Sequence, residues 1–320
     1  MVCGLPDLRL EYPDPTVSWA EDVAAARDLA GRVEAESLEL LNRRNWQVAN
    51  RAETLVERFV NIDRGSVARS DEYLDAIESA RGRPLGPADR VLEVGCGSGA
   101  LAVAAARRGC HVSATDLALR WLVVARKRLE DAGRRDVALA CCAAESLPFP
   151  PESFDVVIAG DVIEHTANAR AFVAGCARVV KPGGMLFLAT PNRFSLGLEP
   201  HVRLWGVGWL PRAFARRYVR RARGSTYDDV QLLSARRLRA LLATEGLEAT
   251  IVPPPISSPS EALYEGVELR LVKGYNRVRR LTGARSILLA VGPFFHVFAT
   301  KPGSAASGAL QPQSRHTPVV

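Results

Sequence analysis

Short apolar stretches alternate with helical stretches between residues 90 and 190, and this alternation constrains the fold more than any other feature. The apolar runs predict strands, and the stretches between them have the length and periodicity of helices. Strands separated in this way pair in parallel through right-handed crossovers. The sequence therefore predicts a doubly wound α/β sheet with strands at 90–94, 111–115, 137–142, 154–159 and 184–190 and helices at 99–108, 117–131 and 167–179.

The flanking segments are expected to cover this sheet and to extend it. Residues 18–60 have helical periodicity, and residues 70–81 predict a further short helix. Because these helices precede the first strand, we expect them to pack outside the sheet. Two more strands are expected at 247–252 and 294–300, with a helix at 260–282 between them.

We divide the chain into five segments on this basis. An N-terminal helical cap spans 1–85, a ligand-binding core 86–192, a basic helical insertion 193–245, and the end of the core sheet 246–301. The insertion follows a strand end, where open α/β sheets place substrate-specific elements. The remaining 302–320 are rich in Ser, Ala, Gly, Pro and Gln, and we expect them to be disordered.

The composition is typical of a globular cytoplasmic protein. With 320 residues, of which 48% are hydrophobic and 24% charged, the chain can bury a large core. The opening MVCGLPDLRLEYPDP lacks the basic start and apolar run of a signal peptide, and the uncharged run 286–300 is too short to span a bilayer. The cysteines include no C-x-x-C pair, so we expect no metal site and interpret Cys141 and Cys142 as buried thiols.

The stretch VLEVGCGSGALAVAAARRG at 91–109 predicts a strand, a glycine-tight turn and an alanine-rich helix. Gly95 and Gly97 permit a sharp turn with no Cβ in the way of a ligand, beside the free N–H groups of the helix that follows. The spacing fits a dinucleotide fingerprint and a different cofactor turn equally well. The stretch alone therefore does not identify its ligand.

Two acids near this turn favour a cationic nucleoside. Glu93 lies two residues before the first glycine, and a carboxylate at the mouth of the turn would repel a pyrophosphate by about 1 kcal/mol or more. Asp116 ends the next strand about 20 residues after Gly95, where an acid reaches both hydroxyls of a ribose. The structural alternatives are a solvent-facing Glu93 and a helix-capping Asp116.

Four motifs occur in order along the core: EVGCGSG, ATD, AAESLPFPPESFDVVIAGDVIEH at 143–165, and VVKPGGMLFLATPN. With these motifs, residues 90–192 resemble the class I S-adenosylmethionine-dependent methyltransferases, in particular the small-molecule branch that includes the ubiquinone and menaquinone biosynthesis methyltransferases. The resemblance implies a seven-stranded, mostly parallel sheet of the Rossmann-like methyltransferase type with an antiparallel last strand. It also implies S-adenosyl-L-methionine as cofactor, a sulfonium cation on adenosine that suits Glu93.

The resemblance further implies a set of cofactor-binding residues: Glu93, Gly95, Cys96, Gly97, Gly99, Asp116, Leu117, Ala144, Glu145 and Asp161. The glycine turn would hold the methionyl end and Asp116 the ribose, while Ala144 and Glu145 would lie by the adenine. The family usually carries an acid or amide just before the Ala-Glu pair, but this chain has Ala143 there. Backbone and apolar contacts from Leu117 and Ala144 would then hold the adenine.

The segment GDVIEH supplies the candidate catalytic residues. Methyl transfer requires alignment of donor and acceptor and, for a hydroxyl acceptor, removal of a proton. His165 has the side chain suited to a base near neutral pH, and Asp161, four residues earlier, would orient it or contact the cofactor. The structural alternative is a histidine that packs on the sheet or caps a helix. His201 has a weaker claim to line the acceptor site, and His111 and His296 are interpreted as structural.

The segment 201–240 carries the basic charge of the protein, with ten arginines and two aspartates in a chain whose net charge is +7. Phe214 and Tyr218 fall on one helical face, and Trp205 and Trp209 lie just ahead. Three interpretations remain open: a solvated surface helix, a lid for a lipophilic or anionic acceptor at a membrane surface, and an RNA-binding patch. RNA is disfavoured because the chain lacks an NPPY-type motif and a separate RNA-binding module.

The sequence therefore predicts a methyltransferase that uses S-adenosyl-L-methionine and acts on a small organic acceptor, with transfer to oxygen favoured. Residues 193–245 and the N-terminal helices would form the acceptor pocket and its cover. RNA or protein methylation is an alternative within the same enzyme class. A nicotinamide-dependent oxidoreductase and a non-catalytic module that keeps the cofactor fold are alternatives from other classes. The sequence identifies neither the acceptor nor the oligomeric state.

Overall fold

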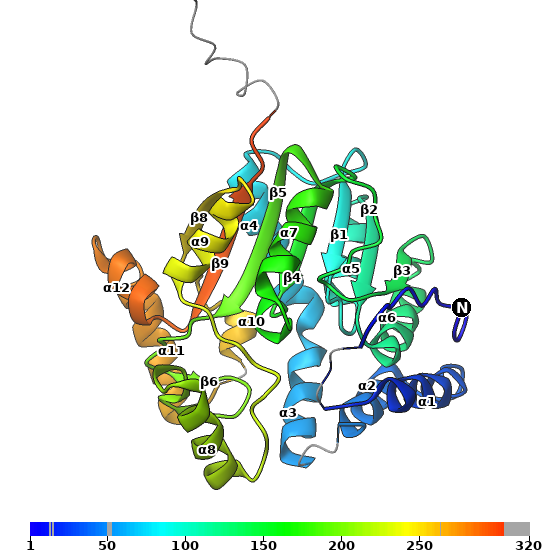
Figure 1. Cartoon of the computed structure of the whole chain (residues 1–320), viewed down its shortest axis with the longest axis horizontal. Helices are drawn as coiled ribbons and strands as arrows, with labels where there is room; N and C mark the ends of the chain where they lie inside the picture. Colours follow the sequence, from blue (N-terminus) through cyan, green and yellow to red (C-terminus); the bar gives the residue numbers. More distant parts are fainter. Residues whose placement is uncertain (13, 15, 50–52, 263, 304–320) are drawn as a thin grey trace, which may run out of the picture.

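A seven-stranded sheet organises the protein, which we describe from a computed structural model covering residues 1–12, 14, 16–49, 53–262 and 264–303 (Figure 1). The strand order is β3-β2-β1-β4-β5-β9-β8. Strands β1 to β5 pair in parallel, and β9 runs antiparallel to both of its neighbours. The strands are β1 Arg90–Val94, β2 His111–Asp116, β3 Ala138–Cys141, β4 Phe154–Gly160, β5 Val180–Pro191, β8 Glu248–Val252 and β9 Phe294–Thr300.

Helices cover both faces of the sheet because each central strand is apolar on both sides. Val91 packs into one core and its neighbour Leu92 into the other. The first core lies under α4 (Ser66–Arg81), α5 (Ala100–Arg107) and α6 (Leu119–Asp131), and the second under α7 (Ala169–Val179) and α9 (Ala235–Thr244). The predicted doubly wound fold with an antiparallel last strand is confirmed.

The first three helices lie at the end of the sheet where the parallel strands finish (Figure 1). Helix α1 (Trp19–Ala30) packs against α6, and α2 (Leu38–Gln47) packs between α3 (Glu53–Arg64) and α6. Ser18 caps α1 through a capping box with Glu21. The predicted helix at 70–81 begins earlier, at Ser66, as α4.

Asp22 anchors this cap to the core. Its fully buried carboxylate accepts hydrogen bonds from the backbone N–H of Leu119, at 2.9 Å, and from the guanidinium groups of Arg9, at 2.6 Å, and Arg120, at 2.8 Å. The carboxylate of one helix therefore caps the N-terminus of another, where the helix dipole favours negative charge.

The insertion forms a small unit with its own apolar cluster. It contains the hairpin of β6 (Leu198–Glu199) and β7 (Leu204–Trp205), a 3₁₀ turn η2 (Val207–Trp209) and α8 (Arg212–Arg223). Ala215 and Val219 of α8 pack with Val207, Tyr227 and Val230. Phe214 and Tyr218, predicted to share a face, are both exposed.

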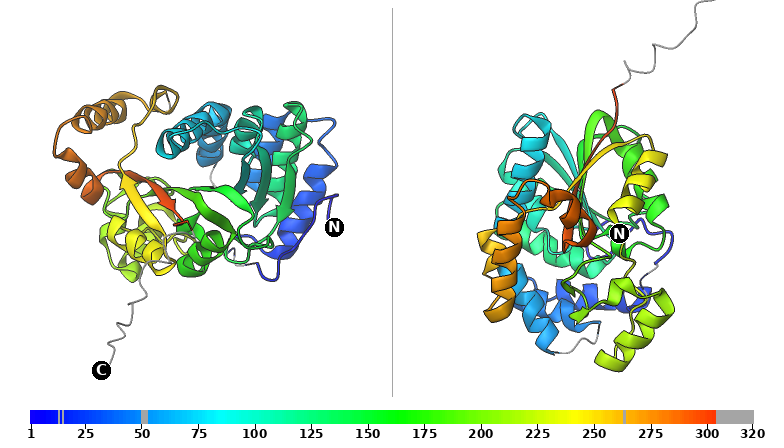
Figure 2. Two further views of the ribbon diagram at one scale, coloured as in Figure 1. Left: turned by 90° about the horizontal axis from the view of Figure 1, so that it is seen from above. Right: turned by 90° about the vertical axis from the view of Figure 1, so that its left-hand side faces the viewer.

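The single helix expected at 260–282 is wrong. Within this range the described residues contain the end of α10 (Ser258–Glu261) and all of α11 (Gly266–Val278), and α12 (Ala284–Val291) follows the range. Glu265 has extended backbone, with φ −132° and ψ 164°, just before α11, which a continuous helix through 260–282 does not allow. Figure 2 shows α11 and α12 at the margin of the molecule. The tail expected to be disordered lies, from residue 304, outside the described residues.

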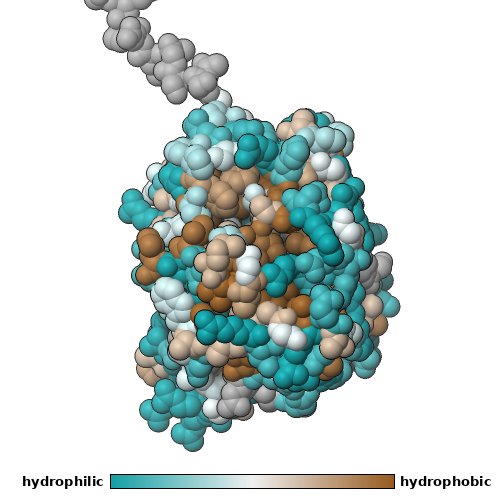
Figure 3. All heavy atoms as spheres, turned by 90° about the vertical axis from the view of Figure 1, so that its right-hand side faces the viewer, coloured by the Kyte–Doolittle hydropathy of each residue, from teal (hydrophilic) through white to brown (hydrophobic). Residues whose placement is uncertain are grey.

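One face of the molecule carries an apolar area. On the side of the molecule that lies to the right in Figure 1, hydrophobic residues gather in the middle of a hydrophilic rim (Figure 3). Cys141 and Cys142 are buried, as predicted. Across the described ranges, we find no helix with the length and apolarity needed to span a membrane.

Candidate functional site

A cavity of about 440 Å³ opens at the carboxyl ends of β1, β2 and β4, and the N-terminal helices close it from the other side. Its size and place are typical of cofactor sites in open α/β sheets. It brings together most of the predicted site residues: Gly95, Gly97, Asp116, Leu117, Ala144, Glu145, Asp161 and His165. Glu93, Cys96 and Gly99 from the same prediction are not among its lining residues.

The turn after β1 requires glycine for three different reasons. Gly95 has φ +71°, and a Cβ there would lie 2.4 Å from a side-chain carbon of Val162. Gly97 has φ +49°, and a Cβ there would enter open space on the cavity side. Gly99 has φ +78°, and a Cβ there would lie 2.9 Å from the Cβ of Ala125, so this glycine lets α5 and α6 approach. Gly97 is the position that keeps the cavity clear.

Asp116 ends β2 with its carboxylate at the cavity. The N–H of Gly97 donates to Oδ2 and the N–H of Ala118 donates to Oδ1, each at 2.9 Å. Burial raises the pKa of Asp116 to about 6, although both hydrogen bonds favour the ionised form. Asp116 therefore lies on the cavity wall, and the capping role predicted as an alternative is wrong, because α6 begins at Leu119 and the N–H of Leu119 donates to Asp22 instead.

Glu93 lies beneath the turn rather than at its mouth. The residue is only 7% exposed, and Oε2 has no hydrogen-bond partner in the part of the chain that the structure describes. Burial raises the pKa of Glu93 to about 8, against a hydrogen bond from the backbone N–H of Ala102 that lowers it. Near neutral pH the side chain is mostly uncharged, so it does not by itself repel a pyrophosphate as the sequence suggested.

Polar contacts that the sequence did not reveal join the glycine turn to the cap. The hydroxyl of Ser98 donates to Asp63 of α3 at 2.6 Å, and Arg128 of α6 pairs with the same carboxylate. Arg128 also donates from Nε to the carbonyl oxygen of Ser98 at 2.8 Å. Asp63 and Ser98 both line the cavity. No motif marks Asp63, because its partners lie far away in the sequence.

The segment after β3 forms the adjoining wall. Cys142, Ala144 and Glu145 line it. Oε1 of Glu145 accepts hydrogen bonds from the N–H groups of Ala167, at 2.8 Å, and Asn168, at 3.3 Å. Glu145 therefore ties this wall to the start of α7.

The turn after β4 places the candidate catalytic residues in the same cavity. Asp161 has φ +55°, and its N–H donates to the carbonyl oxygen of Ala189 at 2.8 Å. His165 follows in the short 3₁₀ helix η1 (Ile163–His165), so both residues reach the cavity. Burial raises the pKa of Asp161, while the charge of His201 lowers it. The charged neighbour that acts on Asp161 is thus His201 of the insertion.

The ring of His165 is oriented by the insertion. Its Nδ1 lies 3.1 Å from the backbone carbonyl oxygen of Asp229. A carbonyl oxygen only accepts hydrogen bonds, so in the neutral ring this contact places the proton on Nδ1 and the lone pair on Nε2.

Comparison with known proteins agrees with this geometry. Residues 92–188 match the family described as methyltransferase domain. The core of this chain is a methyltransferase domain. The prediction of a class I S-adenosylmethionine-dependent methyltransferase core is confirmed.

Curated relatives cover the domain and little beyond it. The ubiquinone biosynthesis O-methyltransferase of Idiomarina loihiensis is 41% identical over 130 residues, which are 38% of this chain and 51% of that protein. The enzyme of the same name from Methylocella silvestris is 34% identical over 166 residues, covering 50% of this chain and 58% of that protein. The chain thus spans between half and three fifths of the length of these two relatives.

Solved structures confirm the fold. A candidate sarcosine dimethylglycine methyltransferase from Galdieria sulphuraria superposes with a TM-score of 0.51 at 17% identity, over 73% of this chain and 86% of that one. At this identity the likeness concerns the backbone alone.

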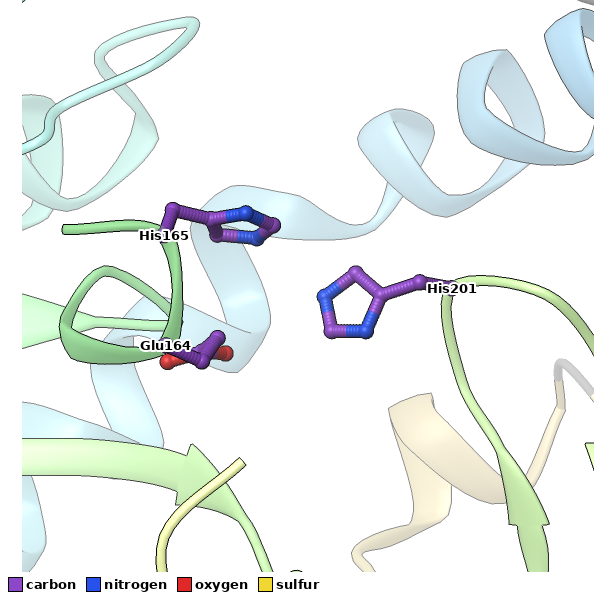
Figure 4. Close-up of side chains that lie close together, drawn as sticks. All are labelled: Glu164, His165 and His201. Atoms are coloured by element: carbon purple, nitrogen blue, oxygen red, sulfur yellow. The ribbon is translucent and has the colours of Figure 1, made fainter. Parts of the chain in front are cut away.

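A buried acid and two histidines meet at the edge of the methyltransferase domain (Figure 4). Glu164 and His165 come from the turn after β4, and His201 comes from the β6–β7 hairpin, with its ring 4.8 Å from that of His165. One ligand atom of each lies within 4.8 Å of the others, a spacing that suits a metal ion. The sequence did not single out Glu164, and the expectation of no metal site stays a prediction.

Electrostatic effects within this cluster follow from burial. Burial raises the pKa of Glu164 to about 8, and the charge of Asp161 adds to the shift. Burial lowers the pKa of His201, but its bond to Glu199, 2.5 Å from Nδ1 to Oε1, outweighs this effect and raises it. His201 is therefore a cation held by Glu199 over a wider pH range than a free histidine.

Two other histidines occupy the positions predicted for them. His111 begins β2 with an exposed side chain. His296 packs against Tyr73 and Phe187, and burial lowers its pKa to about 4.

Aromatic residues of the cap form the part of the cavity wall that the sequence missed. Trp46 stacks on Phe59 at 4.3 Å and meets Trp121 edge-on at 4.8 Å. Asn45, beside them on the wall, is buried. Phe59 fits the helical periodicity of residues 18–60, which indicates packing and does not distinguish a core from a ligand wall.

Proposed function

We propose that this chain is an S-adenosylmethionine-dependent methyltransferase that methylates an oxygen atom of a small organic acceptor. The observation that carries the proposal is the hydrogen bond from Nδ1 of His165 to the Asp229 carbonyl oxygen, in a cavity that also contains the glycine turn and Asp116. This bond selects the neutral tautomer whose basic nitrogen is Nε2, the form that a general base requires. Hydroxyl acceptors need such a base, whereas transfer to a neutral amine can proceed without one.

The residues fit the cofactor. Gly97 leaves open the space that a Cβ would fill, and Asp116 presents its carboxylate to the cavity beside Leu117. We assign Asp116 to the ribose hydroxyls, with Leu117, Ala144 and Glu145 around the adenine. The methionyl end would lie along the turn, where Gly95, Gly97 and Asp161 contact it and where Glu93, Cys96 and Gly99 support the turn from behind.

S-adenosylmethionine, once bound, supplies a methyl group on a positively charged sulfur that leaves as a neutral thioether. His165 would take the proton of the acceptor hydroxyl on Nε2 during this transfer. Asp161 shares the cavity wall with His165 and stabilises positive charge at the reacting centre. The cap excludes water, so that the two reactants meet in a fixed arrangement.

The acceptor pocket would lie between the N-terminal helices and the insertion. His201 and the arginine-rich α8 do not line the cavity, but their positive charge on the insertion beside it favours a lipophilic or anionic acceptor, such as a quinone, a lipid or a secondary metabolite. The curated relatives with 41% and 34% identity are named ubiquinone biosynthesis O-methyltransferase, which supports transfer to oxygen.

Segment 201–240 would contact a membrane surface. Trp205 and Phe214 are more than 60% exposed, and Trp209 is 49% exposed, beside the arginines of α8. Exposed aromatic residues next to arginines suit the interface of an anionic bilayer. Flotation with liposomes that contain phosphatidylglycerol tests this part: we expect the protein to float with them and to stay behind with neutral liposomes.

Isothermal titration with S-adenosylhomocysteine and with NADH tests the proposal. We expect binding of the first and none of the second, followed by transfer of labelled methyl groups in an acceptor screen. Binding of NADH alone would favour a nicotinamide-dependent oxidoreductase, and methylation of RNA or protein alone would favour those acceptors instead. Binding without transfer to any acceptor would indicate a module that keeps the fold without the reaction.

A further inference from the structure

Asn45 presents an unpaired carboxamide to the cavity. It lies near the C-terminal end of α2, and only 2% of the residue is exposed. Neither Oδ1 nor Nδ2 has a hydrogen-bond partner within the described ranges, although the residue lines the cavity wall. A buried amide without partners destabilises a protein, so its presence points to a ligand that completes it.

The surroundings make a hydrogen bond to this amide effective. Trp46 is the next residue, stacked on Phe59 and edge-on to Trp121. Large apolar rings around a polar group exclude water and strengthen any hydrogen bond that it forms.

The position of α2 shows which part of a ligand Asn45 can reach. Helix α2 packs against α6, and Trp121 lies in the first turn of α6, just after Asp116 at the end of β2. Asp161 and His165 follow β4, and β1 separates β2 from β4. With strands about 4.8 Å apart, the ends of β2 and β4 are about 10 Å apart. Asn45 therefore belongs to the Asp116 end of the cavity rather than to the reacting end.

We propose that Asn45 binds the adenosyl half of the methyl donor from the N-terminal cap. This inference rests on the proposed function. A carboxamide offers a hydrogen-bond donor and an acceptor together, and adenosine presents both kinds of group on its base edge and its ribose.

The residues that follow β3 offer few polar side-chain atoms for a contact with the adenosyl group. Ala143 and Ala144 have no polar side-chain atom, and Oε1 of Glu145 accepts from the N–H groups of Ala167 and Asn168. Asn45, on α2 of the cap, brings a polar side chain to the cavity whose Oδ1 and Nδ2 have no hydrogen-bond partner within the described ranges.

Asn42 provides a matched control. It lies one turn earlier on α2, is 1% exposed, and its Oδ1 also lacks a partner in the part of the chain that the structure describes. Unlike Asn45, it is not among the lining residues of the cavity. Asn42→Ala therefore reproduces the loss of a buried amide on α2 without the loss of a cavity contact.

The test is isothermal titration of the full chain with S-adenosylhomocysteine and with 5′-methylthioadenosine, which carries only the nucleoside half. We expect Asn45→Ala to weaken both by a similar factor of about tenfold, and Asn42→Ala to leave both within about twofold. Unchanged affinities in Asn45→Ala would overturn the inference. So would a loss seen for S-adenosylhomocysteine alone, or a change confined to the KM of the acceptor.

A measurement on the unaltered protein covers the case in which the variant does not fold. The side-chain amide resonances of Asn45 in a ¹⁵N-labelled sample should shift when 5′-methylthioadenosine saturates the site, and an unmoved signal contradicts the inference. If the wild-type chain binds neither nucleoside, the proposed function itself fails. If it binds both and Asn45→Ala does the same, only this inference fails.

Discussion

Single residues at the site act through protonation states that burial determines. Glu93 and Glu164 both have pKa values raised to about 8 by burial, whereas Asp116 is raised only to about 6 because two backbone N–H groups stabilise its ionised form. The sequence located Glu93 and Asp116 from their spacing to the glycines. It could not reveal their depth, because depth depends on helices elsewhere in the chain.

The free energy of unfolding should depend on pH through the protonation of Glu93. Between about pH 4.5, where the unfolded chain loses this proton, and pH 8, where the folded chain loses it, the unfolded state binds fewer protons, so stability falls as pH rises. Glu93→Gln removes this contribution. In the wild type it lowers the free energy of unfolding by about 1.4 kcal/mol for each pH unit between pH 4.5 and 8. Urea denaturation of both proteins at pH 5, 6, 7 and 8 should show the variant gaining relative stability as pH rises. A constant difference would contradict the assignment.

His165→Gln tests the proposed base. With saturating donor and acceptor we expect kcat to fall by about a hundredfold, because Nε2 no longer takes the acceptor proton. His111→Gln is the control, since that exposed histidine lies at the start of β2, away from the cavity. A kcat of His165→Gln within about threefold of the wild type would rule out this role.

Elements of the cap are held to the core by charge as well as by apolar packing. Asp22 joins α1 to the start of α6, and Asp63 joins α3 to the glycine turn. The strands and helices of the core were predictable because their periodicity is local. These links were not, because each pairs residues that are far apart in the sequence.

Asp22→Ala should destabilise the fold strongly. The change leaves the buried guanidinium groups of Arg9 and Arg120 without their shared carboxylate, which costs about 3–5 kcal/mol. Urea denaturation measures the loss. Asp28 lies on the same helix as Asp22 and forms an exposed pair with Arg32, so Asp28→Ala should leave stability almost unchanged. Equal effects of the two changes would show that the buried network contributes little.

The molecule as a whole assembles one cavity from segments that begin near residue 14 and end at residue 229. The sequence identified the wall formed by the core, because its motifs are short and ordered. It assigned the cap and the insertion only to a general covering role. Trp46 and Asn45 carry no motif, and their place at the cavity depends on how α2 packs against α6.

Hydrogen exchange should detect protection of the cavity-lining segments when the ligand binds. S-adenosylhomocysteine should slow amide exchange in α2, α3 and the glycine turn, because these segments line the cavity. Helices α11 and α12 contribute no lining residue and should exchange at unchanged rates. Protection limited to the core, with none in α2 or α3, would indicate that the cap does not close on the ligand.

The hydrogen bond between His165 and the Asp229 carbonyl oxygen has a consequence for the proposed base. The histidine belongs to the core, but the oxygen that selects its tautomer belongs to the insertion. Without this contact, the ring proton would no longer be held on Nδ1. A tautomer with the proton on Nε2 cannot take the acceptor proton there, even with both reactants bound. The tautomer that the base requires therefore depends on the contact between the insertion and the core.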